Sequence, residues 1–287
     1  MSAPSATRRP VAKTHKLFVD GAFVRSESGR HVAVDDHRGR HVANAPRASR
    51  KDVRDAMRAA RRAAAPWQAR TAYNRGQILY RFAEALESRA DELAAESARL
   101  RGVDRAAART ELETAVDAAV HYAGWTDKLH AVLGSVNPIA GPYLGLSMPE
   151  PSGVVAVLAP DEPDVLGLVA AILPPLAAGN VVVALVSERW PLLGLHLGEV
   201  LGVADVPGGV VNLLSGLRAE LVEPLAGHRD LDGVLDATGD PKLRERVARL
   251  GAETVKRVAR VQPAAAAGLA AIEPFVEVKT AWHPIGT

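Results

Sequence analysis

The chain has 287 residues, of which 48% are hydrophobic, so it is long and apolar enough to bury a sizeable core. Its 35 basic and 33 acidic residues leave a net charge of only +2, which argues against a nucleic acid partner. It has no cysteine, which excludes disulfides, thiolate metal sites and a thiol nucleophile and suits a cytoplasmic protein. Proline and glycine interrupt the longest apolar region, residues 165–186, so no membrane span is expected.

The N-terminal part is expected to begin with a tail and two short strand pairs. Residues 1–15 are basic and contain neither an acidic residue nor an apolar stretch, which indicates a flexible tail. Residues 16–24 alternate apolar and polar side chains around Asp20 and Gly21, a pattern that predicts a hairpin with a tight turn. A second strand pair is expected within residues 32–45.

Amphipathic helices follow. Between residues 49 and 65 the apolar positions recur at helical spacing, with Ser49 as a plausible N-cap and Pro66 as the stop. Residues 75–100 and 112–129 show the same periodicity and predict two further long helices. The first 130 residues are therefore expected to be mostly helical.

The character of the chain changes at residue 134. Prolines and glycines break any helix across residues 134–149, whereas Tyr143 and Leu144 can still line extended segments, which indicates an exposed β-arm. Beyond it, β-branched runs alternate with helical stretches, and this order predicts a parallel sheet with helices between its strands. The expected strands are residues 153–158, 181–185, 210–214, 233–236, 254–261 and 275–283, and the expected helices are residues 165–176, 192–201 and 241–250.

Six segments in this order carry a resemblance to a known family: KLFVDGAFV, YAGWTDKLH, EPSGVVAVLAP, PPLAAGNVVV, VPGGVVNLLSG and HRDLDGVLDATGD. Together they resemble the aldehyde dehydrogenase superfamily from about residue 16 to about residue 257, and the last strand resembles the C-terminal strand of that family. The resemblance implies an α/β fold with a Rossmann-type parallel sheet, flanking helices, an N-terminal helical layer and a protruding β oligomerisation arm.

The resemblance also implies a domain organisation. Residues 16–262 would form a nucleotide-binding-like domain, residues 134–149 and 272–287 the oligomerisation arm with its C-terminal strand, and residues 263–271 a linker. The catalytic domain of the family, which carries the nucleophilic cysteine, is expected to be missing, because the sequence passes directly from the approach to the general-base motif to the last strand. Val261 stands where that motif has its glutamate.

The matching positions of the active-site turn and the ribose site depart from the family pattern. Asp161 replaces the asparagine that donates to the developing oxyanion in the family. An ionised carboxylate there would repel an oxyanion, and losing one such donor costs about 3 to 4 kcal/mol of transition-state stabilisation. A surface turn is therefore expected at Asp161. Of the lysine and glutamate that hold the adenosine ribose, the lysine is replaced by Leu185 and the glutamate is retained as Glu188.

The phosphate-binding turn of the family corresponds to residues 236–241, where Thr238 and Gly239 are retained as vestigial cofactor positions. Asp240 followed by Pro241 predicts a helix start whose carboxylate caps the N–H groups that a phosphate would otherwise use. Asp236 adds a second negative charge nearby. No bound cofactor is expected, and weak NAD binding is left open.

These observations favour a non-catalytic aldehyde dehydrogenase-like subunit that associates with itself or with a full-length aldehyde dehydrogenase. It would resemble the catalytically dead second domain that some members of the superfamily carry on the same chain. The alternative is an NAD(P)-dependent aldehyde oxidoreductase component that is active with a partner or through an unrecognised nucleophile. No metal site is expected, because the chain lacks cysteine and its histidines are scattered. Glu111, Glu113 and Asp117 are assigned to a solvated helix face.

Overall fold

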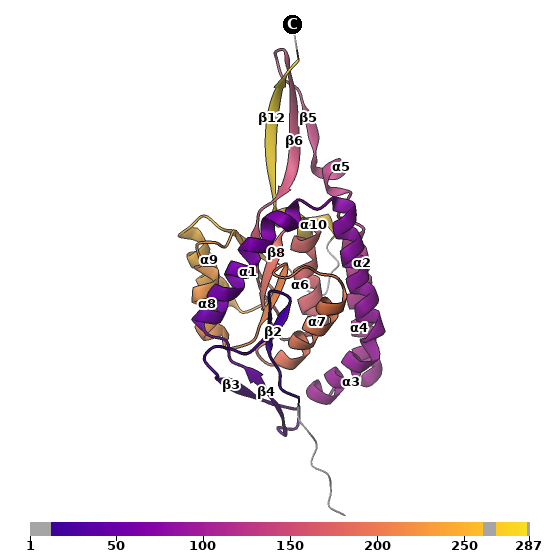
Figure 1. Cartoon of the computed structure of the whole chain (residues 1–287), viewed down its shortest axis with the longest axis vertical. Helices are drawn as coiled ribbons and strands as arrows, with labels where there is room; N and C mark the ends of the chain where they lie inside the picture. The colour runs from indigo at the N-terminus through magenta and orange to yellow at the C-terminus, as the bar shows by residue number, and fades with distance from the viewer. Residues whose placement is uncertain (1–12, 261–267, 286–287) are drawn as a thin grey trace, which may run out of the picture.

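The computed structural model describes residues 13–260 and 268–285. A central seven-stranded sheet with the strand order β11-β10-β7-β8-β9-β1-β2 lies between two groups of helices, and a three-stranded arm protrudes from one end of this body (Figure 1). Among the described residues, no helix combines the length and the hydropathy needed to cross a membrane.

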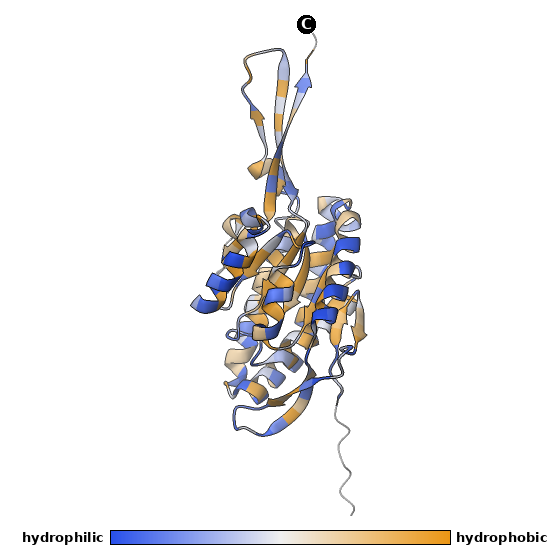
Figure 2. Cartoon of the chain, turned by 90° about the vertical axis from the view of Figure 1, so that its left-hand side faces the viewer, coloured by the Kyte–Doolittle hydropathy of each residue, from blue (hydrophilic) through white to orange (hydrophobic). Residues whose placement is uncertain are grey.

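The five strands at the centre and one side of the sheet are parallel: β7 (Val154–Leu158), β8 (Val181–Leu185), β9 (Val211–Leu214), β10 (Gly233–Asp236) and β11 (Arg257–Arg260). Every residue of β7, β8, β9 and β10 is buried. The strands of a parallel sheet are apolar on both sides because helices cover both faces of the sheet. Figure 2 shows these strands as the most hydrophobic layer. The register pairs Leu158 with Leu185 and with Asp236, so the carboxyl ends of the strands lie at one edge.

Helices cover the two faces of the sheet unequally. Helix α1 (Arg50–Gln68) packs across β7, β8 and β9 and against α8 (Arg218–Ala226), which packs on α9 (Pro241–Ala252). On the other face, α6 (Val165–Ala177) and α7 (Pro191–Val203) contact the strands and are covered in turn. The covering layer consists of α2 (Ala72–Ser88), α3 (Ala90–Arg101) and α4 (Arg105–Ala123), and α5 (Leu129–Leu133) leads to the arm.

The two predicted strand pairs near the N-terminus are confirmed. Strands β1 (Leu17–Val19) and β2 (Ala22–Val24) form a hairpin that extends the sheet, because β1 pairs antiparallel with β9. Asp20 and Gly21 at its tip have φ values of 56° and 74°, the positive pair that a tight turn of this hand requires. Strands β3 (His31–Asp35) and β4 (His41–Pro46) form a separate antiparallel pair.

The first predicted helix starts as expected but ends later. The Ser49 hydroxyl accepts hydrogen bonds from the N–H groups of Lys51 and Asp52, and Asp52 accepts the Ser49 N–H in return at 2.7 Å. Pro66 lies inside α1, so the predicted stop is wrong. Continuing the helix past Pro66 places Trp67, which is 1% exposed, in the core, and that burial outweighs one lost helical hydrogen bond.

The next two helix predictions misplace the breaks. Residues 75–100 were expected as one helix, but α2 and α3 meet at Arg89, whose φ of −112° and ψ of 5° are not helical. The helix expected at 112–129 is α4, which begins earlier because the Asp104 side chain caps the N–H groups of Ala106 and Ala107. No helix was expected at α8, a short element with Pro224 inside it.

The protruding arm agrees with the prediction and joins distant parts of the chain. Strand β6 (Tyr143–Pro151) pairs with β5 (Ser135–Asn137) on one side and with β12 (Val276–Pro284) on the other, all antiparallel. Strand β12 pairs along its whole length, from Val276 opposite Pro151 to Pro284 opposite Tyr143. The predicted last strand is thus part of the arm.

The described residues correct one end of the predicted tail and one end of the predicted linker. Residues 1–12 lie outside the described residues, but His15 is 8% exposed and its ring lies 5.3 Å from that of His196, so the tail does not extend to residue 15. Residues 261–267, which include Val261, also lie outside the described part. The linker predicted to end at residue 271 is wrong at its end, because α10 (Leu269–Ile272) and a 3₁₀ turn (Glu273–Phe275) bury Ile272 and Phe275.

Candidate functional site at the carboxyl edge of the sheet

Asp161 is the centre of a hydrogen-bonded network at the carboxyl edge of the parallel sheet. It lies in the turn after β7, and its Oδ1 accepts hydrogen bonds from the Ser187 hydroxyl at 2.7 Å, the Glu188 N–H at 2.9 Å and the Arg189 N–H at 3.2 Å. All three donors follow β8, the neighbour of β7 in the sheet. The Asp161 carboxylate therefore holds the turn after β8 in place.

Arg218, the first residue of α8, joins this network from the end of β9. Its Nη1 donates to Oδ2 of Asp161 at 2.6 Å, and its Nη2 donates to Oδ1 at 2.9 Å and to the Ala159 carbonyl at 2.7 Å. Only 16% of the Arg218 side chain is exposed. Paired hydrogen bonds of this kind between a guanidinium and a carboxylate are strong and fix the relative orientation of the two groups.

Glu188, which was expected at a ribose position, has its carboxylate engaged within the chain. Its Oε2 accepts the backbone N–H of Arg218 at 2.6 Å, at the N-terminus of α8. A carboxylate is favoured there because the first N–H groups of a helix have no partner inside the helix. Glu188, Asp161 and Arg218 thus link the ends of three adjacent strands.

The charge state of Asp161 follows from this network. Burial alone would raise the pKa of the Asp161 carboxyl, but the hydrogen bonds and the positive charge of Arg218, with the donors Ser187 and Arg189, outweigh burial and hold that pKa below its ordinary value. Asp161 is therefore ionised at neutral pH. The expectation of a mere surface turn is wrong, because Asp161 is a partly buried member of an ion pair.

The predicted phosphate turn also satisfies its own polar groups. The N–H and the hydroxyl of Thr238 both donate to Oδ1 of Asp236, at 3.0 and 2.6 Å. Gly239 has a φ of 74° and open space around it, as a tight turn requires. Asp240 caps α9 by accepting the Lys242 N–H at 2.9 Å, which confirms the predicted helix start. The Asp240 carboxylate therefore occupies the N-terminus of α9.

A second ionic cluster, which sequence reasoning missed, lies beside the Asp161 turn. Arg101 at the end of α3 donates to Glu111 at 2.8 Å and to Asp164 at 3.2 Å, and it also bonds Glu162. Glu162 in turn accepts the Trp190 indole N–H at 3.0 Å. The assignment of Glu111 to a solvated helix face is wrong, because its side chain is 14% exposed and paired with Arg101.

Three carboxylates around one guanidinium leave an excess of negative charge, and Asp164 carries the consequence. Its side chain is 1% exposed. Burial raises the pKa of Asp164, Arg101 opposes this, and Glu111 raises it further, to about 8. Burial and the negative charge of Glu111 therefore favour the protonated form of the Asp164 carboxyl in the native protein.

This protonation predicts a pH dependence of stability. Because the folded-state pKa lies above the ordinary value of 3.8, the native state binds a proton that the unfolded state has lost, and this group's contribution to stability falls as pH rises from about 4 to about 8. The Asp164→Asn variant keeps the acceptor and loses this dependence. The melting temperature of the variant minus that of the wild type should be higher at pH 8.5 than at pH 5 by at least about 2 °C.

The matched control is Glu113→Gln, which neutralises an exposed carboxylate on the neighbouring helix α4. Differential scanning calorimetry at four or five pH values would give the two difference curves. A curve for Asp164→Asn that stays parallel to the wild type over this range would contradict a proton held at Asp164.

Sequence comparison identifies the family to which this geometry belongs. The model of the aldehyde dehydrogenase family matches residues 23–264. The chain belongs to the aldehyde dehydrogenase family. It is 32% identical over 259 residues to a hydroxyisobutyraldehyde dehydrogenase of Mycolicibacterium austroafricanum, covering 90% of this chain and 50% of the relative. Over 221 residues it is 33% identical to a mitochondrial aldehyde dehydrogenase, family 2 member B4, of Arabidopsis thaliana, covering 76% and 40% of the two chains.

The fold comparison gives the same relationship. An aldehyde dehydrogenase from Bacillus cereus, solved as an NAD⁺ complex, superposes with a TM-score of 0.82 at 28% identity and covers 86% of this chain and 50% of its own. The chain thus spans about half the length of the relatives it matches. The predicted α/β dehydrogenase fold is confirmed. Within residues 13–260 and 268–285, the elements that come after β11 are α10, the 3₁₀ turn and the arm strand β12.

Proposed function

We propose that this aldehyde dehydrogenase-family chain is a non-catalytic subunit that acts by associating, through its β-arm, with itself or with a full-length aldehyde dehydrogenase. The observation that carries the proposal is the exposure of large apolar side chains along the arm. These side chains are Val136, Tyr143, Leu144, Met148, Val278, Trp282 and Ile285. Several large apolar side chains exposed together on a protruding element are typical of a protein interface.

The register distributes these side chains over both faces of the arm. Val278 lies opposite Pro149 and Trp282 opposite Gly145, and directly opposed residues share a face. Leu144 and Met148 lie on the other face, since side chains alternate along β6. Figure 2 shows hydrophobic positions interspersed along all three strands of the arm. A partner can therefore be bound on either face.

The edge of β12 supports association by strand pairing as well. Strand β12 pairs with β6 along one edge, and within residues 13–260 and 268–285 its other edge has no strand partner. A long unpaired edge with apolar side chains readily adds a strand from another chain. The arm thus offers both backbone and side-chain contacts to a partner.

The residues at the carboxyl edge of the sheet support a non-catalytic role. The chain has no cysteine to act as the nucleophile of its relatives. Asp161 is ionised and paired with Arg218 at the position of the oxyanion-stabilising asparagine, and Glu188 is bonded to the start of α8. Asp240 caps the helix that would meet the cofactor phosphates. With these contacts in place, we expect little or no NAD binding. The chain would then work in the cytoplasm beside an active dehydrogenase, like the catalytically dead second domain of some members of the superfamily.

A turnover assay tests this proposal. The purified chain should give no NAD-dependent or NADP-dependent oxidation of simple aldehydes, while a full-length relative such as the hydroxyisobutyraldehyde dehydrogenase serves as the positive control. NAD titrated into the chain should leave its tryptophan fluorescence unchanged. Robust turnover by the isolated chain would show that the proposal is wrong. Turnover that requires both this chain and a dehydrogenase with an inactivated cysteine would favour the alternative, an oxidoreductase component active only with a partner.

A further inference from the structure

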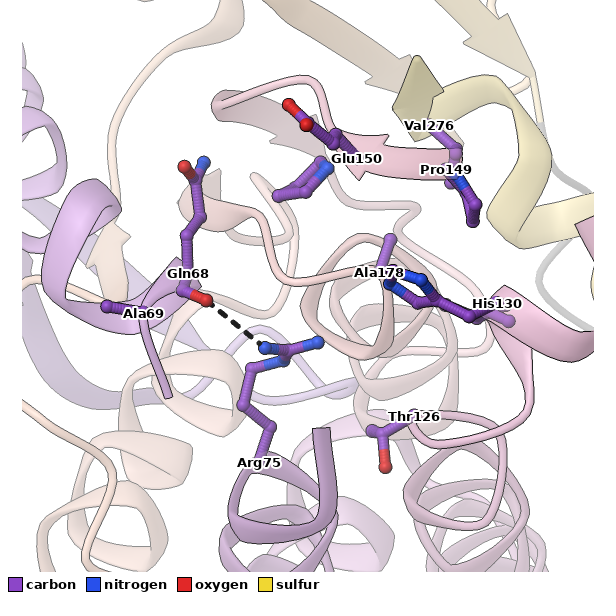
Figure 3. A pocket seen from close by; sticks show the side chains of 11 residues that line it. Gln68, Ala69, Arg75, Thr126, His130, Pro149, Glu150, Ala178 and Val276 are labelled. Carbon is purple, nitrogen blue, oxygen red and sulfur yellow. Dashed lines mark hydrogen bonds between the residues drawn. The ribbon is translucent and has the colours of Figure 1, made fainter. Parts of the chain in front are cut away.

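A pocket of about 360 Å³ lies at the root of the arm, away from the carboxyl edge of the sheet. Its walls come from the arm strands β6 and β12, from α5 and from the ends of α1 and α6. Arg75 of α2 forms part of the floor, and Figure 3 shows its side chain beneath Gln68, Ala178 and His130. No part of the network around Asp161 lines this pocket.

The guanidinium of Arg75 is only partly satisfied by the protein. Its Nη1 donates to the backbone carbonyls of Arg70 at 2.7 Å and of Gln68 at 3.5 Å. The buried Nε has no hydrogen-bond partner, and no bond within the described residues engages Nη2. The dashed line in Figure 3 marks the hydrogen bond from Arg75 to the Gln68 carbonyl. The opposite side of the guanidinium faces away from Gln68, toward the space below Ala178 and His130.

Arg75 also lacks an ionic partner. It is 8% exposed, yet no carboxylate of the described residues forms an ion pair with it. The one carboxylate in the pocket wall, Glu150, bonds Lys279 on the neighbouring strand β12. Burial lowers the pKa of Arg75, which is the effect of desolvation without a compensating anion. A buried charge without a partner is costly, so this site favours an anion from outside.

We propose that this pocket binds a small organic monocarboxylate, with the carboxylate on Nη2 of Arg75. Nη2 can donate a charge-assisted hydrogen bond to a carboxylate oxygen, and such bonds are stronger than those between neutral groups. Leu129, Pro149, Pro151 and Val276 form apolar walls around this charge. They accommodate the hydrocarbon part of an acid of the size of butyrate or benzoate, as pockets for small molecules combine apolar walls with few polar anchors.

Isothermal titration calorimetry of the full chain with benzoate and butyrate tests the proposal. One site per chain should be occupied, with half-saturation at or below about 10 mM for a ligand of this size. Benzamide, which has the shape of benzoate without its charge, should not bind, and inorganic phosphate should bind at least tenfold more weakly than benzoate. Sodium chloride at matched ionic strength gives the baseline. No heat with either acid, or equal binding of benzamide or phosphate, would overturn the proposal.

Two variants assign the binding to Arg75. Arg75→Gln should weaken benzoate binding about tenfold or more, because it removes a charge-assisted hydrogen bond. Arg70→Gln, an exposed arginine five residues earlier, is the matched control and should bind like the wild type. Ala178→Leu narrows the pocket without changing its charge and should also weaken binding. If Arg75→Gln does not fold, the Ala178→Leu variant decides the outcome. An affinity for benzoate that is unchanged in Ala178→Leu, or in a folded Arg75→Gln, overturns the assignment.

Discussion

Replacing Val278 and Trp282 together by aspartate is expected to convert the chain from an oligomer to a monomer. The two side chains are 61% and 64% exposed and lie on the same face of β12. Charges placed there would be buried without partners in any interface formed by this face, and each such charge costs several kcal/mol. Size-exclusion chromatography with light scattering should give a multiple of 30.3 kDa for the wild type and 30.3 kDa for the variant.

The control for this experiment uses the same substitution at exposed valines on the body. Val203 and Val255 are 70% and 93% exposed, and Val203→Asp with Val255→Asp should leave the mass of the wild type unchanged. Circular dichroism should show that both double variants are folded. A wild-type chain that is monomeric at all concentrations and captures no purified full-length aldehyde dehydrogenase would contradict association through the arm.

The second large effect is expected at the carboxyl edge of the sheet. Asp161→Ala should lower the free energy of unfolding by about 3 kcal/mol, because it leaves the largely buried Arg218 without its anion and removes the acceptor of three donors after β8. Urea denaturation followed by tryptophan fluorescence measures this loss.

Two further variants separate charge from hydrogen bonding. Asp161→Asn keeps an acceptor for Ser187 and the backbone N–H groups, so it should lose clearly less stability than Asp161→Ala. Asp55→Ala removes a surface ion pair with Arg54 and should cost no more than about 1 kcal/mol. If Asp161→Ala costs no more than Asp55→Ala, the network does not hold these three strand ends together.

The parts of the fold that were predictable from sequence are those governed by local rules. The parallel strands follow from short β-branched runs that bury both faces, and β10 has the predicted bounds at Gly233 and Asp236. The starts of α1 and α9 follow from Ser49 and from Asp240 before Pro241, because capping depends on residues only two or three positions apart. The turn at Asp20 and Gly21 belongs to the same class.

The parts that were not predictable depend on contacts between distant residues. Arg218 lies 57 positions from Asp161, and no local pattern indicates that the two side chains meet at the sheet edge. Arg101 and Asp164 are 63 positions apart and pair only because α3 ends beside the start of α6. The break at Arg89 has no proline or glycine to mark it, since packing rather than propensity separates α2 from α3. For the same reason the pocket above Arg75 has no signal in the sequence.

The pairing of β6 with β12 fixes an order of events during synthesis. Residues 143–151 leave the ribosome long before residues 276–284, and the two segments together form most of the arm. Until β12 has been made, β6 can be paired only with the short strand β5, while the parallel sheet of the body already has all its strands. Domains fold as their segments emerge, and contacts between distant segments form late. The surface that we propose for association can therefore be completed only after all strands of the central sheet have been made.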